Sequence, residues 1–209
     1  MTNHKYTLLD VGYIITMNSS RDILPHSTIL IEDNHIKKIG GKTDFKNYVG
    51  DIIDAKHLVA MPGFIQTHIH LCQTLFRGLA DDLQLLDWLQ QKIFPFEAAH
   101  NEHSMNISAL LGVAELFRSG TTTILDMGSI HFQEEVIRAV GESGMRAFLG
   151  KAMMDKNDLY PKLKETTKSA LSSTRNLAER FQYLRWQSKI CSGAAFCTFL
   201  FREITARNK

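Results

Sequence analysis

The sequence has few cysteines, and their spacing does not suggest a metal ribbon or a disulfide framework. The 209 residues include three, Cys72, Cys191 and Cys197, and none forms a CxxC pair. An odd number of widely separated thiols is unlike the dense pairing of small secreted domains. We therefore expect a protein of a reducing compartment, the cytoplasm.

Long apolar runs and a strong charge bias are also missing. No window approaches 18 uncharged apolar residues, and the first ten residues, MTNHKYTLLD, have no cationic segment leading into an apolar one. The 24 Lys and Arg residues nearly balance 22 Asp and Glu residues, which leaves a formal charge of +2. We therefore expect no membrane segment, and no nucleic acid or membrane surface as partner.

The composition is that of a globular protein, with 44% hydrophobic and 22% charged residues. Residues 6–59 show short β segments, and Asp33-Asn34 lies between two of them, where Asn would tolerate the positive φ of a hairpin turn. Beyond Pro62 and Gly63, strand-like runs alternate with helical ones. This alternation predicts βα units on a parallel sheet.

Three such units can be distinguished. Strands are expected at 58–70, 121–128 and 145–154, and helices at 84–93, 104–118, 132–142 and 171–184. Pro95 is expected to end the helix at 84–93. A closed parallel barrel needs eight units and about 250 residues. The chain is therefore either an open doubly wound sheet or the front part of a barrel.

His68 and His70 end the first apolar run, which begins at Leu58. Residues i and i+2 of a strand point to the same side, roughly 6.6 Å apart, so both imidazoles can reach one metal ion. The carboxyl end of a parallel strand is also where α/β folds place their sites. The alternative is a solvent-facing or core pair, because HxH arises often by chance in a sequence with nine histidines.

The segment MPGFIQTHIHLCQTLFRGLADDLQLLDWLQQKIFPFEAAH resembles the opening of the amidohydrolase superfamily. It is most similar to the branch with the methylthioadenosine and S-adenosylhomocysteine deaminases and the triazine chlorohydrolases, over about residues 6–190. The resemblance implies an α/β fold: a (β/α)8 TIM-like barrel joined to a small β-sandwich. It also implies one divalent metal, zinc first and iron second, with His68 and His70 as its first two ligands.

Trp88 and Glu97 are candidate substrate-binding residues by the same resemblance. Their own context favours core packing for Trp88 and a surface carboxylate for Glu97. In the nucleoside-deaminating members, residues matching these two line the pocket, and the carboxylate accepts hydrogen bonds from a ribose diol. Lys151 stands where those members have an arginine, so the purine-nucleoside substrate remains open.

The remaining catalytic positions of the family have no counterpart. The resemblance implies a third His ligand, a further His, a proton-shuttling Glu and a metal-binding Asp on later strands, but the last histidine is His131. No catalytic residue is assigned. Asp126 and His131 are the first suspects to complete the metal shell, and two imidazoles alone should bind zinc weakly.

The sequence thus predicts three regions: β-sandwich strands at 1–60, a partial barrel at 61–190 and a tail at 191–209 unlike the family, for which a frameshift or premature end is our hypothesis. An incomplete barrel exposes sheet edges, so we expect self-association. The expected function is hydrolysis of carbon–nitrogen or related bonds of a small heterocycle, such as an adenosine thioether, a guanine-like base or a triazine, with this chain itself inactive. The alternative is a non-catalytic remnant or interaction module.

Overall fold

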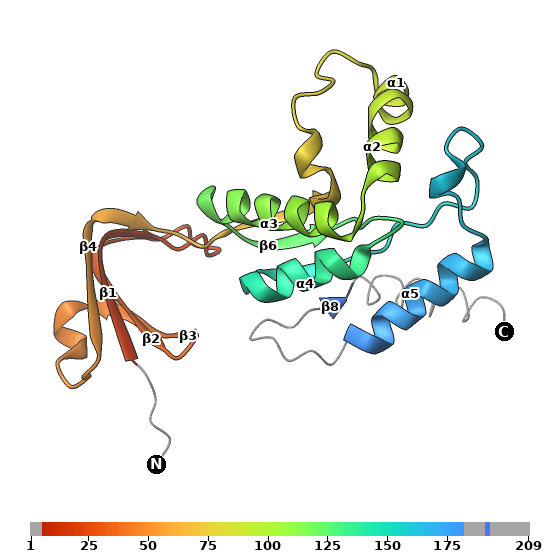
Figure 1. Cartoon of the computed structure of the whole chain (residues 1–209). Coiled ribbons are helices and arrows are strands. Elements are labelled where there is room, and N and C mark those ends of the chain that lie inside the picture. The colour runs from red at the N-terminus through yellow and green to blue at the C-terminus, as the bar shows by residue number, and fades with distance from the viewer. Residues whose placement is uncertain (1–5, 182–190, 193–209) are drawn as a thin grey trace. The chain divides into compact units, whose positions relative to one another are not determined.

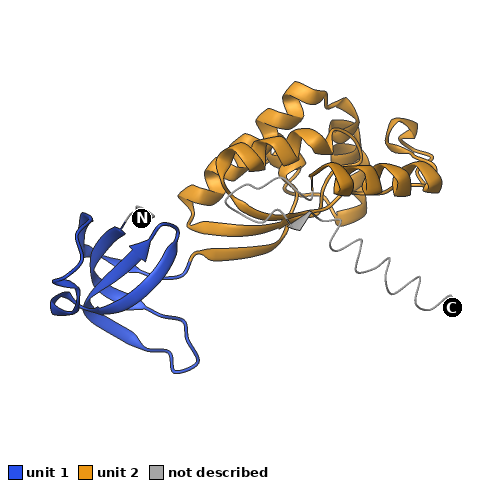
Figure 2. Ribbon diagram, turned by 90° about the horizontal axis from the view of Figure 1, so that it is seen from below, with its two compact units in different colours: residues 1–62 blue, residues 63–209 orange. Residues whose placement is uncertain are grey.

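The computed structural model describes residues 6–181 and the backbone of Cys191 and Ser192 (Figure 1). The chain divides into two compact units, residues 1–62 and 63–209, which Figure 2 shows in different colours. The tail expected at 191–209 lies outside the described residues apart from those two. Among the described helices, none combines the length and apolarity that crossing a bilayer requires.

Unit 1 is a four-stranded sheet with the order β3-β2-β1-β4. Its elements are β1 (Tyr6–Ile15), β2 (Ile23–Glu32), β3 (His35–Gly41), the 3-10 turn η1 (Lys42–Phe45) and β4 (Asp51–Ala60). Strands β1, β2 and β3 pair antiparallel, whereas β1 and β4 are parallel. Buried Val11, Ile14, Ile29 and Ala55 form a core on one side of the sheet.

The predicted hairpin at Asp33-Asn34 is confirmed, because β2 and β3 pair across these two residues. The left-handed position is Asp33, with a φ of 56°, and not Asn34. Aspartate shares the short polar side chain that makes this conformation tolerable for asparagine. The turn was therefore located correctly, but its strained residue was assigned wrongly.

Unit 2 is a parallel sheet of order β5-β6-β7-β8 with connecting helices. Its strands are β5 (Phe64–Ile69), β6 (Thr121–Asp126), β7 (Arg146–Leu149) and β8 (Cys191–Ser192). Its helices and helical turns are η2 (Leu71–Phe76), α1 (Leu85–Trp88), η3 (Leu89–Ile93), α2 (Phe94–Ala99), α3 (Glu102–Arg118), α4 (Gln133–Ser143), η4 (Pro161–Leu163) and α5 (Thr167–Phe181). The expected alternation of strands and helices is confirmed.

The strand expected from Leu58 to His70 is two strands in two different sheets. Strand β4 ends at Ala60 in unit 1, and β5 begins at Phe64 in unit 2. Pro62 has no amide to donate to a ladder, and a Cβ on Gly63 would lie 2.3 Å from the Thr122 side chain. The Pro-Gly pair thus separates the two strands, and the histidine pair belongs to a shorter strand than expected.

The helix expected to end at Pro95 continues to Ala99. Residues 85–99 form one helical segment, in which the π turn η3 lies between α1 and α2. Pro95 stands in the first turn of α2, directly after the π turn. A proline ring would otherwise clash with the carbonyl four residues earlier, and the wider π turn gives it room. The consequence is that Glu97 lies on a helix and not in a loop.

The core of unit 2 lies between its sheet and the helices α3 and α4. Its buried members include Met105, Ile124, Val136, Val140 and Ala147. Large side chains remain exposed elsewhere in the sheet: Phe64 is 53% and Phe148 43% exposed. Strand β5 is an edge strand among the described residues, whereas β7 pairs with β8 at Phe148 and Leu149.

Two glycines with positive φ offer a matched test of this packing. Gly128 has a φ of 80°, and a Cβ there would lie 2.2 Å from the Gly150 carbonyl oxygen; Gly144 has a φ of 74° with nothing within 4 Å. We expect Gly144→Ala to lower the free energy of unfolding by about 1 kcal/mol, the cost of a left-handed residue. Gly128→Ala should cost at least twice as much in urea unfolding. Equal losses would contradict the close approach of the two loops.

Candidate functional site

His68 lies near the carboxyl end of β5 and His70 directly after it, and their rings are in an edge-to-face arrangement. The ring centroids are 5.3 Å apart and the planes cross at 69°. Gln66 pairs with Ile124 and Ile69 with Asp126, so β5 contains one more residue than β6 over this stretch. Such a bulge re-aims the side chains next to it. Here the extra residue lies between Gln66 and Ile69, the stretch that contains His68.

The His70 ring has one nitrogen without a partner. Its Nδ1 atom is buried and has no hydrogen-bond partner in the described part of the chain. Burial lowers the pKa of His70, the neighbouring His68 lowers it further, and the backbone of Gly128 acts in the opposite direction. A neutral imidazole is the form that binds a metal. An orphaned nitrogen beside a second imidazole therefore fits a divalent ion.

Asp126 fixes the turn that follows the histidine pair. Its side chain is 1% exposed; Oδ1 accepts a hydrogen bond from the Leu71 amide at 2.8 Å, and Oδ2 accepts one from the Gly128 amide at 3.0 Å. Gln133 Nε2 donates to Oδ2 at 3.3 Å. The carboxylate thus joins the end of β5 to the loop after β6, a role that the sequence did not indicate.

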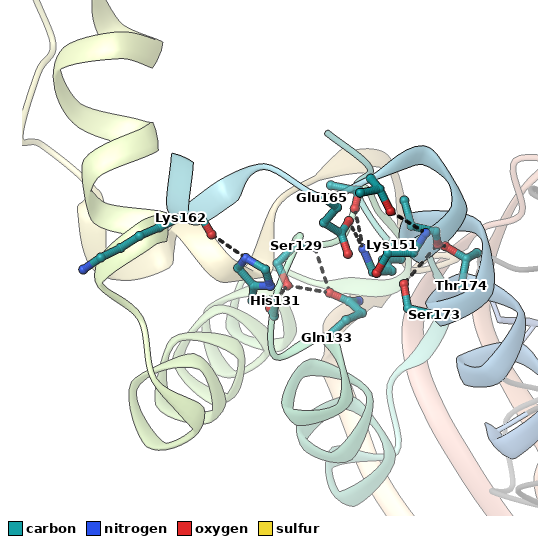
Figure 3. A network of polar contacts seen from close by, with 12 residues as sticks. Ser129, His131, Gln133, Lys151, Lys162, Glu165, Ser173 and Thr174 are labelled. Atoms are coloured by element: carbon teal, nitrogen blue, oxygen red, sulfur yellow. Dashed lines mark hydrogen bonds and ion pairs between the residues drawn. The ribbon is translucent and has the colours of Figure 1, made fainter. Parts of the chain in front are cut away.

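Asp126 and His131 do not complete a metal shell with the histidine pair. No group of three His, Cys, Asp or Glu side chains in residues 6–181 is placed to hold an ion. The Asp126 oxygens serve backbone amides, and His131 donates its Nε2–H to the Lys162 carbonyl oxygen at 2.7 Å (Figure 3). The expectation that these two were the first suspects is therefore wrong for the described residues.

Glu97 is drawn toward the turn after His70. Its Oε1 accepts a hydrogen bond from Gln73 Nε2 at 2.9 Å and a weaker one from Cys72 Sγ at 3.6 Å. Burial raises the pKa of Glu97, whereas Gln73, Cys72 and His100 lower it. The carboxyl is half-buried and is not the surface group that its sequence context favoured. The signal that sequence reasoning missed was the continuation of the helix through Pro95.

Trp88 lies on the same helical segment, in α1, and is half-buried. Nine residues separate it from Glu97, about 13 Å along a helix axis. The expected apolar helix face is not packed at its start, because Leu85 is 67% and Leu86 68% exposed. The structure therefore places Trp88 and Glu97 on one element but in different turns.

Lys151 follows β7 and is not a free cation. Its Nζ forms an ion pair with Glu165 Oε2 at 2.6 Å and donates to the Ala152 carbonyl oxygen at 3.0 Å (Figure 3). Both charged side chains are about nine-tenths buried. The pair borders a polar cavity of about 810 Å³, to which α5 contributes Ser169 and Ser173. Lys151 thus ties the loop after β7 to the segment before α5.

Residues 59–190 match the model of the amidohydrolase family, which is more than half of the chain. The chain belongs to the amidohydrolase family. Its α/β fold is accordingly that of the N-terminal part of a TIM-like barrel, as the sequence resemblance predicted. The edge that carries His68 and His70 is the edge where such barrels place their sites.

Curated relatives of this amidohydrolase chain are deaminases. It is 51% identical over 129 residues to a 5'-deoxyadenosine deaminase of Methanocaldococcus jannaschii, an alignment that covers 61% of this chain and 30% of the relative. It is 34% identical over 178 residues to a 5-methylthioadenosine/S-adenosylhomocysteine deaminase of Lawsonia intracellularis, covering 84% and 39%. The chain thus spans about a third of the length of the curated relatives it matches.

Solved structures show the same fold. An adenosine deaminase from Xanthomonas campestris with bound zinc superposes with a TM-score of 0.78 at 23% identity, over 89% of this chain and 41% of the other. The guanine deaminase of E. coli gives a TM-score of 0.75 at 26% identity, over 88% and 45%. The first of these likenesses, below a quarter identity, concerns the fold alone.

The buried carboxyl of Asp126 generates a pH prediction. Burial raises the pKa of Asp126 from 3.8 to about 6, although the Leu71 and Gly128 amides and Gln133 lower it. Because the folded pKa lies above the unfolded one, the folded chain holds the proton more tightly. This group's contribution to stability is therefore complete below pH 4 and declines as pH rises to about 6, by about 3 kcal/mol in all.

Carboxyl carbon NMR of the folded chain measures this directly. We expect Asp126 to titrate near pH 6, whereas exposed Asp158, whose pKa is lowered by Lys164, should titrate below its usual range and serves as the control. An Asp126 midpoint at or below that of Asp158 would mean that the three hydrogen-bond donors lower the pKa of Asp126 by more than burial raises it, which would contradict this prediction.

Proposed function

We propose that this chain supplies the first metal-binding strand and part of the substrate pocket of a metal-dependent hydrolase that cleaves carbon–nitrogen bonds of a nitrogen heterocycle. The observation that carries the proposal is the orphaned Nδ1 of His70 beside the His68 ring, at the carboxyl end of a parallel strand. The deaminase relatives favour an adenosine-like substrate over a guanine-like base or a triazine.

His68 and His70 would hold one divalent ion. Zinc is the first candidate, because the Xanthomonas campestris adenosine deaminase of this fold carries zinc, and iron is the second. A bound ion would act as a Lewis acid that activates water for attack on the ring carbon. The protein's own part is to fix the His70 ring through the turn held by Asp126. Two nitrogens are fewer than the three or four ligands of stable zinc sites, so we expect weak binding.

Glu97 and Trp88 would bind the substrate. A carboxylate can accept hydrogen bonds from two neighbouring hydroxyls, and an indole can pack against a heterocycle. Support for Glu97 comes from its contacts with the turn that follows His70. Support for Trp88 is its place on the same helical segment, two and a half turns earlier.

A second candidate is a non-catalytic module that binds a partner through its sheet. It is favoured by the lack of a third metal-binding side chain near His68 and His70 within residues 6–181, and by the exposed edge strand β5. Edge strands with apolar side chains such as Phe64 promote pairing with another chain. On this hypothesis the purified chain self-associates and shows no turnover.

Metal binding should depend on two of the nine histidines. We expect the chain to bind zinc in calorimetry with one site, and His68→Ala or His70→Ala to abolish that site. His103→Ala is the matched control, because His103 is exposed in the first turn of α3. Zinc binding that survives both single variants would place the ion elsewhere.

Turnover separates the two candidate functions. The zinc-loaded chain is incubated with adenosine, an adenosine thioether and an aminotriazine, and released ammonia is measured. Ammonia that is lost in His68→Ala supports the hydrolase. Sedimentation of a defined oligomer together with no ammonia from any of the three supports the interaction module.

A further inference from the structure

Gln73 connects the end of β5 to Glu97, using its backbone amide for one bond and its side-chain amide for the other. Its backbone amide donates to the His70 carbonyl oxygen at 3.0 Å, and its side-chain amide donates to Glu97 Oε1 at 2.9 Å. These two bonds bridge the end of β5 and the helix α2. In the described part of the chain no other residue is hydrogen-bonded to both His70 and Glu97, so Gln73 sets the position of one relative to the other.

The turn that carries Gln73 is itself fixed. Its first residue, Leu71, donates its amide to Asp126 and accepts from Ser108 Oγ at 2.8 Å. The next residue, Cys72, accepts at its carbonyl from His100 Nε2 at 2.8 Å. Leu71 and Cys72 are at most 1% exposed. Because the backbone of the two residues before Gln73 is held, the Gln73 side chain starts from a fixed position.

The bonds to Glu97 use only one of its two oxygens. Gln73 and Cys72 both donate to Oε1, and in residues 6–181 no hydrogen bond reaches Oε2. Oε2 is also not among the fully buried unpartnered atoms, so it keeps some exposed surface. The carboxylate is thus anchored through one oxygen and presents the other.

We propose that Gln73 is a positioning residue that holds Glu97 by Oε1, so that Oε2 is presented to a hydroxyl group of the ligand beside His68 and His70. This inference rests on the proposed function, in which Glu97 binds the substrate. Gln73 itself contacts no ligand. A ligand with a vicinal diol is the class of compound that such a carboxylate recognises.

The test uses the full chain and a variant that removes only the donor. Gln73→Met keeps the length of the side chain but cannot donate, and Gln90→Met, at an exposed position of η3, is the matched control. Amide spectra establish that both variants are folded. The first readout is the Glu97 carboxyl carbon titration, which requires neither metal nor substrate.

We expect Gln73→Met to raise the pKa of Glu97 further, because burial then meets less opposition from hydrogen bonding. The titratable groups around this carboxyl, Cys72, His100 and Asp126, are unchanged in both variants. Gln90→Met should leave the pKa of Glu97 where it is. An unchanged pKa in Gln73→Met would overturn the proposal.

The second readout is the affinity of the zinc-loaded chain for adenosine and for 2',3'-dideoxyadenosine, which lacks the diol. Gln73→Met should weaken adenosine binding by about tenfold, the lower end of what a hydrogen bond to a charged group contributes, and should leave the dideoxy compound unaffected. In a Glu97→Ala background the same change should have no further effect. Equal loss for both nucleosides would overturn the positioning role.

Failure of the proposed function gives a different pattern. If the parent chain binds adenosine and its dideoxy analogue equally, Glu97 does not recognise the diol, and the presentation of Oε2 to a ligand is refuted as well. The Glu97 titration would in that case still report the Gln73 bond as a purely structural contact. The two failures are therefore distinguishable.

Discussion

The buried carboxylate of Asp126 is the constraint on which the site depends. It lies at the end of β6 and accepts hydrogen bonds from the amides of Leu71 and Gly128, one on each oxygen. Burial of a carboxylate is costly unless its oxygens are satisfied, and hydrogen bonds to a charged group contribute about 1.5–3 kcal/mol each. The same two bonds determine where β5 ends and where the next loop begins.

The hydrogen bonds of Asp126 position the turn that follows His70. The turn η2 begins at Leu71, whose amide Asp126 holds, and continues through Cys72 and Gln73 to Glu97 on α2. One short segment therefore carries a candidate metal ligand and orients a candidate substrate carboxylate. Under the proposed function, these few residues would link the ion to the ligand, so a change at one should affect the other.

The elements of the fold could be predicted from the periodicity of the sequence, whereas the choice of a barrel over an open doubly wound sheet came from the resemblance to the amidohydrolases. Alternating strand and helix patterns predicted the parallel sheet of unit 2, and the polar pair at Asp33 predicted the hairpin of unit 1. The wrong predictions arose at prolines, which can either end an element or be accommodated in it. Pro95 is tolerated in a helix because a π turn precedes it, and Pro62 with Gly63 divides an apolar run that reads as one strand.

The candidate site was less predictable, because its parts meet only through the tertiary fold. The HxH spacing indicated a metal pair from local geometry alone. The contacts of Asp126 with Leu71 and of Gln73 with Glu97 join residues 55 and 24 positions apart, which leaves no pattern in a single sequence. His131 was a plausible ligand because it lies on the loop after β6. Only the fold shows that its Nε2 is hydrogen-bonded to the Lys162 carbonyl oxygen.

The most direct test is an amide NMR titration of the unmodified chain between pH 4 and 8. If Asp126 holds both loops, the Leu71 and Gly128 amide protons shift together with a common midpoint near pH 6, the pKa of the buried carboxyl. Amide shifts at these two positions that do not change over this range, or that follow different midpoints, would contradict the account.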